Sequence, residues 1–162
     1  MNDWQAVVLA AGKGTRFKSR LPKPLHTLAG QEMVRYPLRT LAEAGIERIK
    51  VVVGHGSQQI RQSLGTQYVF VKQAEQLGTG HAVLQAQQKA KGKGENLLVL
   101  NADVPLVRAN TLRDLMERHA SANATITLLT ATESPSKGLG KIKRDSSGSI
   151  TKIIEDSEAK GR

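Results

Sequence analysis

The sequence predicts an α/β fold in which a Rossmann-like, mostly parallel sheet carries helices on both faces, with a β-hairpin near the C-terminus. Three observations lead to this fold class. Strand-like apolar runs alternate with segments of helical spacing, which is typical of right-handed βαβ units. The 162 residues fit one domain with a sizeable core. Only five residues are aromatic, so Val, Leu, Ile and Ala must fill the interior, which suits a sheet between helices.

The first part of the chain predicts a strand, a loop and a helix in that order. Residues 4–10 (WQAVVLA) form an apolar run that predicts a buried strand, and residues 11–23 form a loop rich in Gly, Lys, Arg and Pro. Residues 31–44 repeat apolar positions at helical spacing and end before Gly45, a typical helix stop. Pro37 lies inside this helix, and we expect it to kink the axis.

The same alternation continues along the chain. We predict further strands at residues 47–53, 67–72, 96–101 and 123–131. We predict further helices at residues 57–64, 79–90 and 109–120, the last capped by Asn110 or Thr111. Residues 140–144 and 149–155 predict a hairpin around Ser147-Gly148. In such a fold ligands bind beyond the carboxyl ends of the strands, so the segments after the first and fourth strands are the candidate site.

Composition narrows the class of ligand. The net charge of +10 is spread over both halves of the chain, which suits an anionic partner such as nucleotide phosphate or nucleic acid. Scarce aromatics argue against a nucleic-acid reader, because such proteins usually stack bases on aromatic rings. The chain has no cysteine, and its apolar run at residues 6–11 is too short to span a membrane. We therefore expect a cytoplasmic protein without membrane or nucleic-acid partners.

The loop that follows the first strand carries the clearest chemical signal. Gly12 and Gly14 allow close backbone approach to a ligand, and successive N–H groups there can form an anion nest. Lys13, Arg16 and Lys23 add positive charge around it. The spacing matches neither a P-loop nor the dinucleotide fingerprint, which needs a third glycine where this chain has Phe at position 17. We interpret the loop as a triphosphate-binding segment.

Three further segments carry weaker signals. Asp103 follows the fourth strand: it is either a hard carboxylate ligand, which suits Mg²⁺ bridging substrate phosphates, or only a helix-capping or loop residue. Residues 73–82 (QAEQLGTGHA) join the third strand to a helix: they either read the edge of a base or serve only as a capped turn. Residues 138–142 (GLGKI) and Glu155 either leave room for a bulky ligand with hydroxyl groups or simply build the hairpin. The histidines, including His81, show no metal-ligand spacing and receive no catalytic role.

In this order the segments resemble the uridylyltransferase domain of bacterial N-acetylglucosamine-1-phosphate uridylyltransferases, usually bifunctional enzymes. LAAGKGTR (9–16) followed by LPKPLHTLAG (21–30) resembles the signature loop of the family, although the first motif alone indicates only the wider sugar-nucleotide pyrophosphorylases. QAEQLGTGHAV (73–83) is much more specific to the family. The resemblance covers essentially the whole chain and implies a fold of the nucleotide-diphospho-sugar transferase type. The chain departs from the family pattern at Ala102, Leu139 and Lys141.

The resemblance also implies roles for individual residues. Arg16 and Lys23 would be catalytic phosphate contacts, and Asp103 would bind Mg²⁺. The sugar would be held by Asn101, Gly140 and Glu155. The nucleotide would be bound by Leu9, Ala10, Ala11, Gly12, Gly14, Thr15, Lys23, Gln73, Gln76, Gly78 and Thr79.

The reaction that the resemblance implies is transfer of UMP from UTP to N-acetylglucosamine 1-phosphate, which gives UDP-N-acetylglucosamine, a cell-wall precursor, and pyrophosphate. In the family this domain continues beyond Glu155 and is followed by a β-helix acetyltransferase domain, and the parent proteins are trimers. We therefore expect residues 1–162 to be the N-terminal part of a nucleotidyltransferase domain. Two alternatives stay open: a sister enzyme for another sugar phosphate, and a module that binds nucleotide without turnover.

Overall fold

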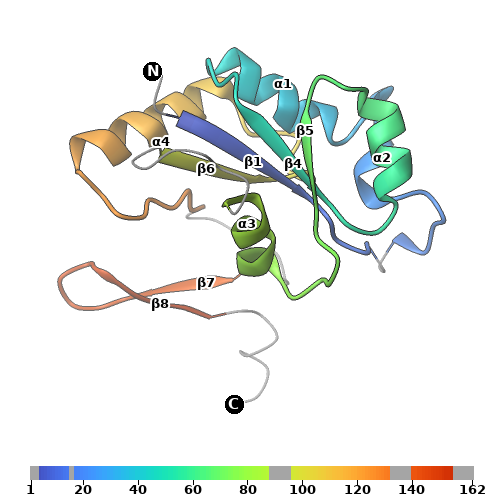
Figure 1. Cartoon of the computed structure of the whole chain (residues 1–162). Helices are drawn as coiled ribbons and strands as arrows, with labels where there is room; N and C mark the ends of the chain where they lie inside the picture. The colour runs from blue at the N-terminus through green and yellow to red at the C-terminus, as the bar shows by residue number, and fades with distance from the viewer. Residues whose placement is uncertain (1–3, 15–16, 88–95, 132–139, 155–162) are drawn as a thin grey trace. The chain divides into compact units, whose positions relative to one another are not determined.

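The computed structural model describes residues 4–14, 17–87, 96–131 and 140–154 (Figure 1). The chain divides into two compact units, Met1–Thr127 and Leu128–Arg162. The first unit contains the parallel sheet and the four described α-helices, and the second contains an antiparallel hairpin. No helix among the described residues is both long enough and apolar enough to cross a lipid bilayer.

The central sheet of the first unit is parallel throughout. Its strands are β1 (Trp4–Ala10), β4 (Ile49–Val53), β5 (Val69–Lys72) and β6 (Asn96–Asn101), in the spatial order β5-β4-β1-β6. The chain moves outward from β1 to β5 and then returns to the other side of β1 to add β6. This reversal makes the carboxyl ends of β1 and β6 the topological switch point, where open α/β sheets bind ligands.

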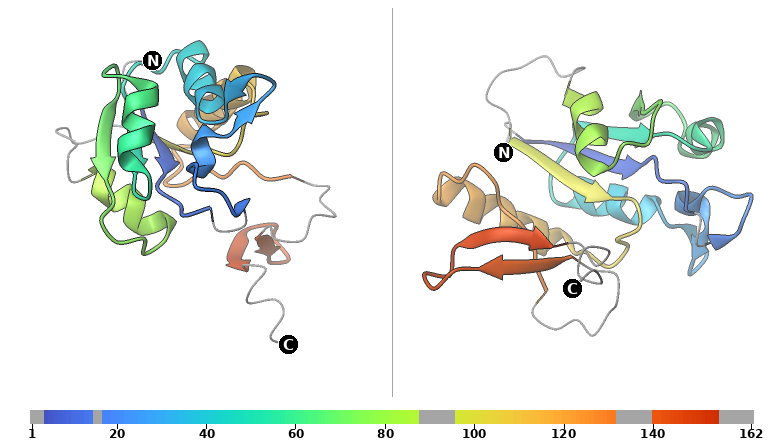
Figure 2. Two further views of the ribbon diagram at one scale, coloured as in Figure 1. Left: turned by 90° about the vertical axis from the view of Figure 1, so that its right-hand side faces the viewer. Right: turned by 90° about the horizontal axis from the view of Figure 1, so that it is seen from below.

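Helices cover both faces of this sheet, as the sequence predicts (Figures 1 and 2). One face carries α1 (Arg35–Glu43), α2 (Ser57–Leu64) and α4 (Ala109–Ser121), whose Leu41, Ile60 and Leu112 side chains are fully buried. The other face carries α3 (Thr79–Gln87), which packs small side chains, Ala82 and Ala86, against the sheet. The two faces follow from the alternation of side chains along each strand.

The expected start of the helix at residues 31–44 is wrong. Gln31–Glu32 forms β3 and pairs with β2 (Thr27–Leu28), and α1 begins only at Arg35. The two-residue turn between β2 and β3 places Ala29 and Gly30 at φ of 49° and 81°, the conformation of a tight hairpin turn. Pro37 is consequently the third residue of α1, where a missing N–H costs nothing, and the expected internal kink has no cause.

Two further expectations about local structure are also wrong. Residue Arg108, not Asn110 or Thr111, precedes the first turn of α4, and the Asn110 side chain instead accepts a hydrogen bond from Arg113 at 2.5 Å. Residues 123–131 form no strand despite their alternating pattern, and Ile126 is 76% exposed. Alternation describes two faces of a segment, but a strand also needs a neighbouring edge for its hydrogen bonds, and no described strand pairs with this one.

The remaining elements agree with the predictions apart from their ends. β4 and β5 each begin two residues later than expected, and α3 is described as far as Gln87. In the second unit, β7 (Lys141–Arg144) and β8 (Ile150–Ile154) form the predicted antiparallel hairpin. Its turn is closed by Asp145, whose carboxylate accepts hydrogen bonds from the Ser147 and Ser149 N–H groups, at 2.9 and 3.0 Å.

A charged network ties β3 to two helices in the first unit. The Glu32 carboxylate accepts hydrogen bonds from Arg35 Nε at 2.7 Å and from the Ser63 hydroxyl at 2.6 Å. Arg35 also donates to the Ser63 carbonyl at 2.6 Å. Burial by itself raises the pKa of Glu32, but the hydrogen bonds from Ser63 and Arg35 and the charge of Arg35 outweigh it and lower this pKa.

We expect Glu32→Gln to destabilise the fold at pH 7 by about 1–2 kcal/mol, because charge-assisted hydrogen bonds are lost. Since the pKa of Glu32 is lowered in the folded state, its contribution is present above the unfolded value of about 4.3 and is lost as the pH falls through the folded value. Urea unfolding at pH 7 and at about pH 3 measures both effects. Glu43→Gln is the matched control, because its exposed pair with Arg39, at 3.7 Å, should contribute little. Equal losses for both variants at pH 7 would contradict the expectation.

Candidate nucleotide-binding site

The candidate site begins where β1 and β6 end side by side. In the register of the two strands Leu9 lies opposite Asn101, and the Ala102 N–H donates to the Leu9 carbonyl at 3.0 Å. The glycine loop that follows β1 and the Asp103 segment that follows β6 therefore leave the sheet at the same edge. The sequence rule that selected these two segments is satisfied by the observed topology.

The glycine loop folds back onto the short 3₁₀ helix η2 (Lys23–Leu25). Gly14 has φ of +59°, and a Cβ at that position would lie 2.7 Å from Lys23 Cβ. Glycine is therefore required there both by the backbone conformation and by the close approach of Lys23. The loop and Lys23 form one packed unit at the carboxyl edge of the sheet. Gly12 differs, because a Cβ there would meet nothing within 4 Å.

Lys23 joins the glycine loop to the end of β6. Its ammonium group donates a short hydrogen bond to Asp103 Oδ2, across 80 residues of sequence. The two side chains are 31% and 39% exposed, so the pair is open to solvent and to a ligand. A cation and a carboxylate thus face each other at the switch point.

The segment after β5 reaches the same edge from the other side of β1. A Cβ added at Gly54, just after β4, would lie 2.8 Å from the Ala11 carbonyl oxygen and 2.9 Å from Gln76 Nε2. Gly54 is therefore the contact point between the first and third motif segments. Three segments that are far apart in sequence converge here, and the close approach depends on the missing side chain.

We expect Gly54→Ala to destabilise the fold by about 1–3 kcal/mol, because the added methyl group overpacks a contact made partly by backbone. Ala11 is buried and its carbonyl cannot move without shifting the end of β1. Thermal unfolding followed by circular dichroism measures the loss. Gly12→Ala is the matched control, because it lies at the same edge but would meet no atom. A Gly54→Ala melting temperature equal to that of Gly12→Ala would refute the close approach.

A buried glutamine organises the segment after β5. Gln73 is only 3% exposed, and its Nε2 donates to the Gly78 carbonyl at 3.2 Å and lies 3.1 Å from His81 Nδ1. Gln76 Nε2 donates weakly to the Gln73 carbonyl at 3.4 Å. Gly78 has φ of +94°, which favours glycine at the turn into α3. The turn and the helix start are thus tied together by the Gln73 amide.

The structure brings together most of the predicted nucleotide-binding residues that it describes. The β1 loop, Lys23 and Asp103 meet at one edge, and Ala11 meets the Gln76 side chain across Gly54. Gly140 lies exposed in the second unit, immediately before β7. The predictions for Thr15, Arg16 and Glu155 concern residues outside the described part of the chain. The roles assigned from the sequence stay predictions at this stage.

Asp103 is the residue at this edge whose carboxylate could hold a metal ion. Within the described ranges no group of three His, Cys, Asp or Glu side chains could hold one. One carboxylate is nevertheless compatible with Mg²⁺, which is commonly bound by one or two carboxylates together with substrate phosphates. The ammonium group of Lys23 already occupies a cation position at this carboxylate. Asp103 therefore fits a metal ion that arrives with the nucleotide.

Sequence reasoning missed two contributors to this region. Gly54 shows no motif of its own, because its importance comes from Ala11 and Gln76, which are distant in sequence. His81 lacks metal-ligand spacing, so the sequence indicates no role for it, yet both of its ring nitrogens face glutamine amides, those of Gln73 and Gln85. The only available signal was the i, i+4 spacing of His81 and Gln85, which share a helix face.

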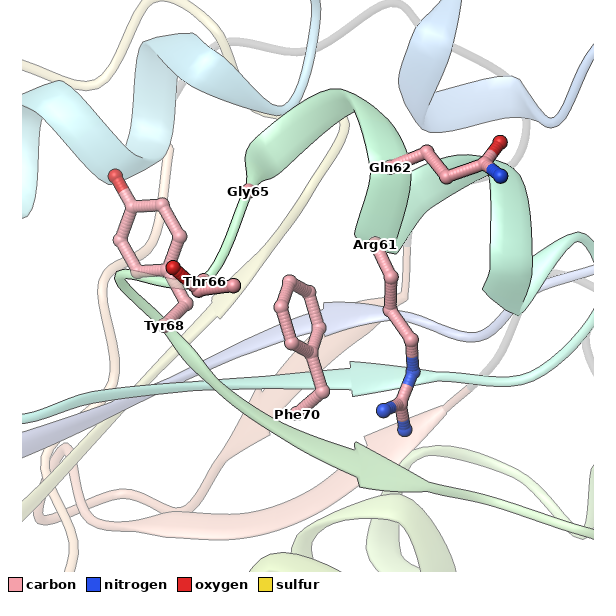
Figure 3. Close-up of a pocket in the computed structure, with 6 residues that line it drawn as sticks. All are labelled: Arg61, Gln62, Gly65, Thr66, Tyr68 and Phe70. Atoms are coloured by element: carbon pink, nitrogen blue, oxygen red, sulfur yellow. The ribbon is translucent and has the colours of Figure 1, made fainter.

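A separate hollow lies away from this edge (Figure 3). It has a volume of about 550 Å³ and is lined by residues of α2, of the connection leading into β5 and of β5 itself. Arg61 lies over the Phe70 ring at 5.2 Å from its centroid, and Tyr68 completes the aromatic wall. Because this connection precedes β5, the hollow lies at the amino end of that strand. It has no carboxylate and does not belong to the candidate site.

A parallel sheet with a glycine loop, a lysine and a carboxylate at its switch point defines a nucleotide-binding α/β protein of the transferase type. The particular family follows from comparison with known proteins. The model of the MobA-like NTP transferase domain matches residues 6–160, and the chain belongs to this family.

Curated relatives extend the match over nearly the whole chain. The "Bifunctional protein GlmU" of Heliobacterium modesticaldum is 46% identical over 159 residues, which are 98% of this chain and 35% of the relative. The protein of the same name from Enterococcus faecalis is 44% identical over the same shares. These matches confirm the family resemblance inferred from the motifs. The chain spans about a third of the length of these relatives.

Solved structures confirm the fold class. A nucleotidyl transferase from Methanothermobacter thermautotroptrophicus, Mth528, is similar with a TM-score of 0.63 and 25% identity, over 72% of this chain and 58% of its own. Rv0371c from Mycobacterium tuberculosis has a TM-score of 0.63 at 19% identity, over 74% and 61%, and this likeness concerns the fold alone. Nucleotidyl transferase folds therefore share the arrangement described above.

Proposed function

We propose that this chain carries the nucleotide site of an enzyme that transfers UMP from UTP to N-acetylglucosamine 1-phosphate, giving UDP-N-acetylglucosamine, a cell-wall precursor, and pyrophosphate. The observation that carries the proposal is the pairing of Lys23 with Asp103 at the switch point, beside the glycine loop. Membership of the NTP transferase family and 46% identity to a bifunctional protein GlmU support it. The specific base and sugar rest on the motif resemblance.

In this proposal the glycine loop and Lys23 hold the triphosphate. Gly12 and Gly14 leave space for backbone N–H groups to approach phosphate oxygens, and Lys23 neutralises their charge. Residues Gln73, Gln76, Gly78 and Thr79 line the base, and Asn101 lies at the end of β6 towards the sugar. Arg16 is proposed as a further phosphate contact, and Gly140 and Glu155 as sugar contacts.

The chemistry needs no general base. A phosphate oxygen of the sugar 1-phosphate attacks the α-phosphorus of UTP, and the bond from that phosphorus to the bridging oxygen breaks to release pyrophosphate. The nucleophile is already anionic, so no proton has to be removed. The chain must align the two anions and offset their repulsion, which are positioning and electrostatic contributions.

We propose Mg²⁺ as the cofactor and Asp103 as its protein ligand. Asp103 would hold the ion beside the triphosphate, where the ion would supply charge neutralisation. A structure of the same fold, Rv0371C from Mycobacterium tuberculosis, is a complex with manganese, which is consistent with a divalent ion in this fold. In the nucleotide complex Lys23 would exchange the Asp103 carboxylate for a phosphate.

The test is pyrophosphate release by the 162-residue chain with UTP, N-acetylglucosamine 1-phosphate and Mg²⁺. Calorimetry with UTP and Mg²⁺ on the same sample measures nucleotide binding separately. Turnover supports the complete proposal, and binding without turnover supports a nucleotide-binding module. Failure to bind UTP in the presence of Mg²⁺ would reject both.

A sister enzyme with another acceptor is the second candidate. The inositol-1-phosphate CTP transferase from T. maritima resembles the chain with a TM-score of 0.51 and 26% identity, over 61% of this chain and 43% of its own. The name of that enzyme specifies a different base and a different acceptor. Release of pyrophosphate with CTP or with another sugar 1-phosphate, but not with N-acetylglucosamine 1-phosphate, would favour this candidate.

Several expectations from the sequence stay proposals. The absence of cysteine agrees with a cytoplasmic location, and the shortage of aromatic rings speaks against nucleic-acid partners. A trimeric parent protein follows only from the family resemblance. The assignment of residues 1–162 to the N-terminal part of a larger domain likewise stays a prediction.

A further inference from the structure

The Gln73 side chain is nearly buried, but one of its two polar atoms has no partner. Its Nε2 faces the Gly78 carbonyl and His81 Nδ1, while Oε1 accepts no hydrogen bond from the described residues. No fully buried side-chain oxygen in the described part of the chain lacks a partner, so Oε1 must reach the surface. A residue that is 3% exposed thus presents a single acceptor atom outward.

The orientation of this amide is determined by its neighbours. A carbonyl oxygen can only accept, so the atom that faces the Gly78 carbonyl must be the NH₂ group. Its second hydrogen points to His81 Nδ1, which must therefore be the unprotonated ring nitrogen. A half-turn of the amide would set Oε1 against two acceptors at once.

His81 is held in the matching tautomer from its other side. When Nδ1 accepts, the hydrogen of a neutral imidazole is on Nε2. The Gln85 Nε2 atom is placed 3.2 Å from His81 Nε2. Because an NH₂ group cannot accept this hydrogen, the Gln85 amide takes the opposite orientation in this tautomer, and its oxygen accepts the hydrogen. Because Gln85 lies one turn further along α3, the helix supports the tautomer that Gln73 requires.

Without His81, the Gly78 carbonyl by itself would hold the Gln73 amide less firmly than the two acceptors do together. It also accepts the Ala82 N–H of α3 at 3.2 Å, so it is shared between two donors. Without an acceptor at position 81, a half-turn of the Gln73 amide would cost one shared hydrogen bond instead of two. His81 therefore acts through Gln73 as a positioning residue.

We infer that His81 sets base preference by keeping Gln73 Oε1 facing the nucleobase. This inference rests on the proposed nucleotide site and states which nucleobase that site prefers. A fixed acceptor matches the N3–H donor of uracil, whereas the N3 atom of cytosine is itself an acceptor and is repelled. The N–H groups of the first turn of α3 lack partners within the helix and suit the neighbouring carbonyl of uracil. The geometry thus favours UTP over CTP.

The test compares UTP and CTP affinities, each with Mg²⁺, for wild type, His81→Phe and His81→Asn by calorimetry. His81→Phe keeps a ring but removes the acceptor, and we expect the preference for UTP to fall about fivefold, the equilibrium effect of one neutral hydrogen bond. His81→Asn keeps an acceptor near the Nδ1 position and should retain the preference. A purely structural role would weaken both nucleotides equally and leave the ratio unchanged, which would overturn the inference.

A second measurement does not depend on nucleotide binding or on the folding of a variant. Nitrogen-15 NMR of the His81 ring in the nucleotide-free wild type should show Nε2 protonated and Nδ1 unprotonated at neutral pH. The opposite tautomer would overturn the inference. Failure of the wild type to bind UTP would instead reject the proposed function, whereas UTP preference that survives His81→Phe would reject only the role of His81.

Discussion

Asp103→Asn is expected to reduce pyrophosphate release from UTP on the order of 100-fold or more, comparable to the loss of a preorganised electrostatic group. The substitution keeps the size of the side chain and a hydrogen-bond acceptor for Lys23, but it removes the negative charge that a metal ion requires. Because the pair is exposed to solvent, the folding stability should change by about 1 kcal/mol or less. The measurements are steady-state turnover and thermal unfolding.

Asp114→Asn is the matched control for this variant. Asp114 is an exposed aspartate on α4, and its replacement changes the net charge by the same amount. It should leave both turnover and stability unchanged. A calorimetric titration adds a direct comparison, since Mg²⁺ should strengthen UTP binding to the wild type but not to Asp103→Asn. Turnover of Asp103→Asn within threefold of the control would rule out Asp103 as the metal ligand.

Lys23→Met is expected to weaken transition-state stabilisation on the order of 100-fold, because one cation near the transferred phosphate is removed. Methionine keeps the unbranched side chain that packs against Gly14, so the glycine loop should keep its conformation. The effect should differ in kind from that of Asp103→Asn. Lys23→Met frees the Asp103 carboxylate, so binding of Mg²⁺ before nucleotide should be retained or strengthened, while binding of UTP falls.

Arg118→Met controls for the loss of a single positive charge. Arg118 is exposed in the last turn of α4, and the neighbouring His119 ring lies 5.4 Å from Trp4 at the start of β1. It is therefore at the amino edge of the sheet, away from the candidate site. Equal losses of UTP affinity in Lys23→Met and Arg118→Met would mean that only overall charge matters. The double variant of Lys23 and Asp103 should show strongly non-additive losses, because the two side chains are in contact.

Much of the fold could be predicted from local pattern. The buried runs of β1, β4 and β6 read directly as strands, and the alternation with helices indicated the parallel sheet and its covered faces. Expectations were wrong where a partner element decides the outcome. Residues 31–32 joined β2 instead of a helix, and residues 123–131 found no strand edge to pair with.

The candidate site, like the fold, could be predicted from the sequence only in part. The glycines of the β1 loop, the position of Asp103 after β6 and the motif around Gln73 were visible as residue types in sequence. Their convergence was not, because it depends on strand order and on contacts such as Gly54 with Ala11 and Gln76. The orientation of the Gln73 amide depends on His81, whose role no spacing rule indicated.

The sequence by itself determined the class of protein and the chemical groups available to it, because periodicity, glycine placement and charge are properties of short segments. Tertiary structure alone decided that Lys23 meets Asp103 across 80 residues, and which atom of Gln73 is free. The physical reason is that a hydrogen bond or an ion pair depends on distances of a few ångströms between groups. Such distances exist only once the order of the strands and the packing of the loops are established.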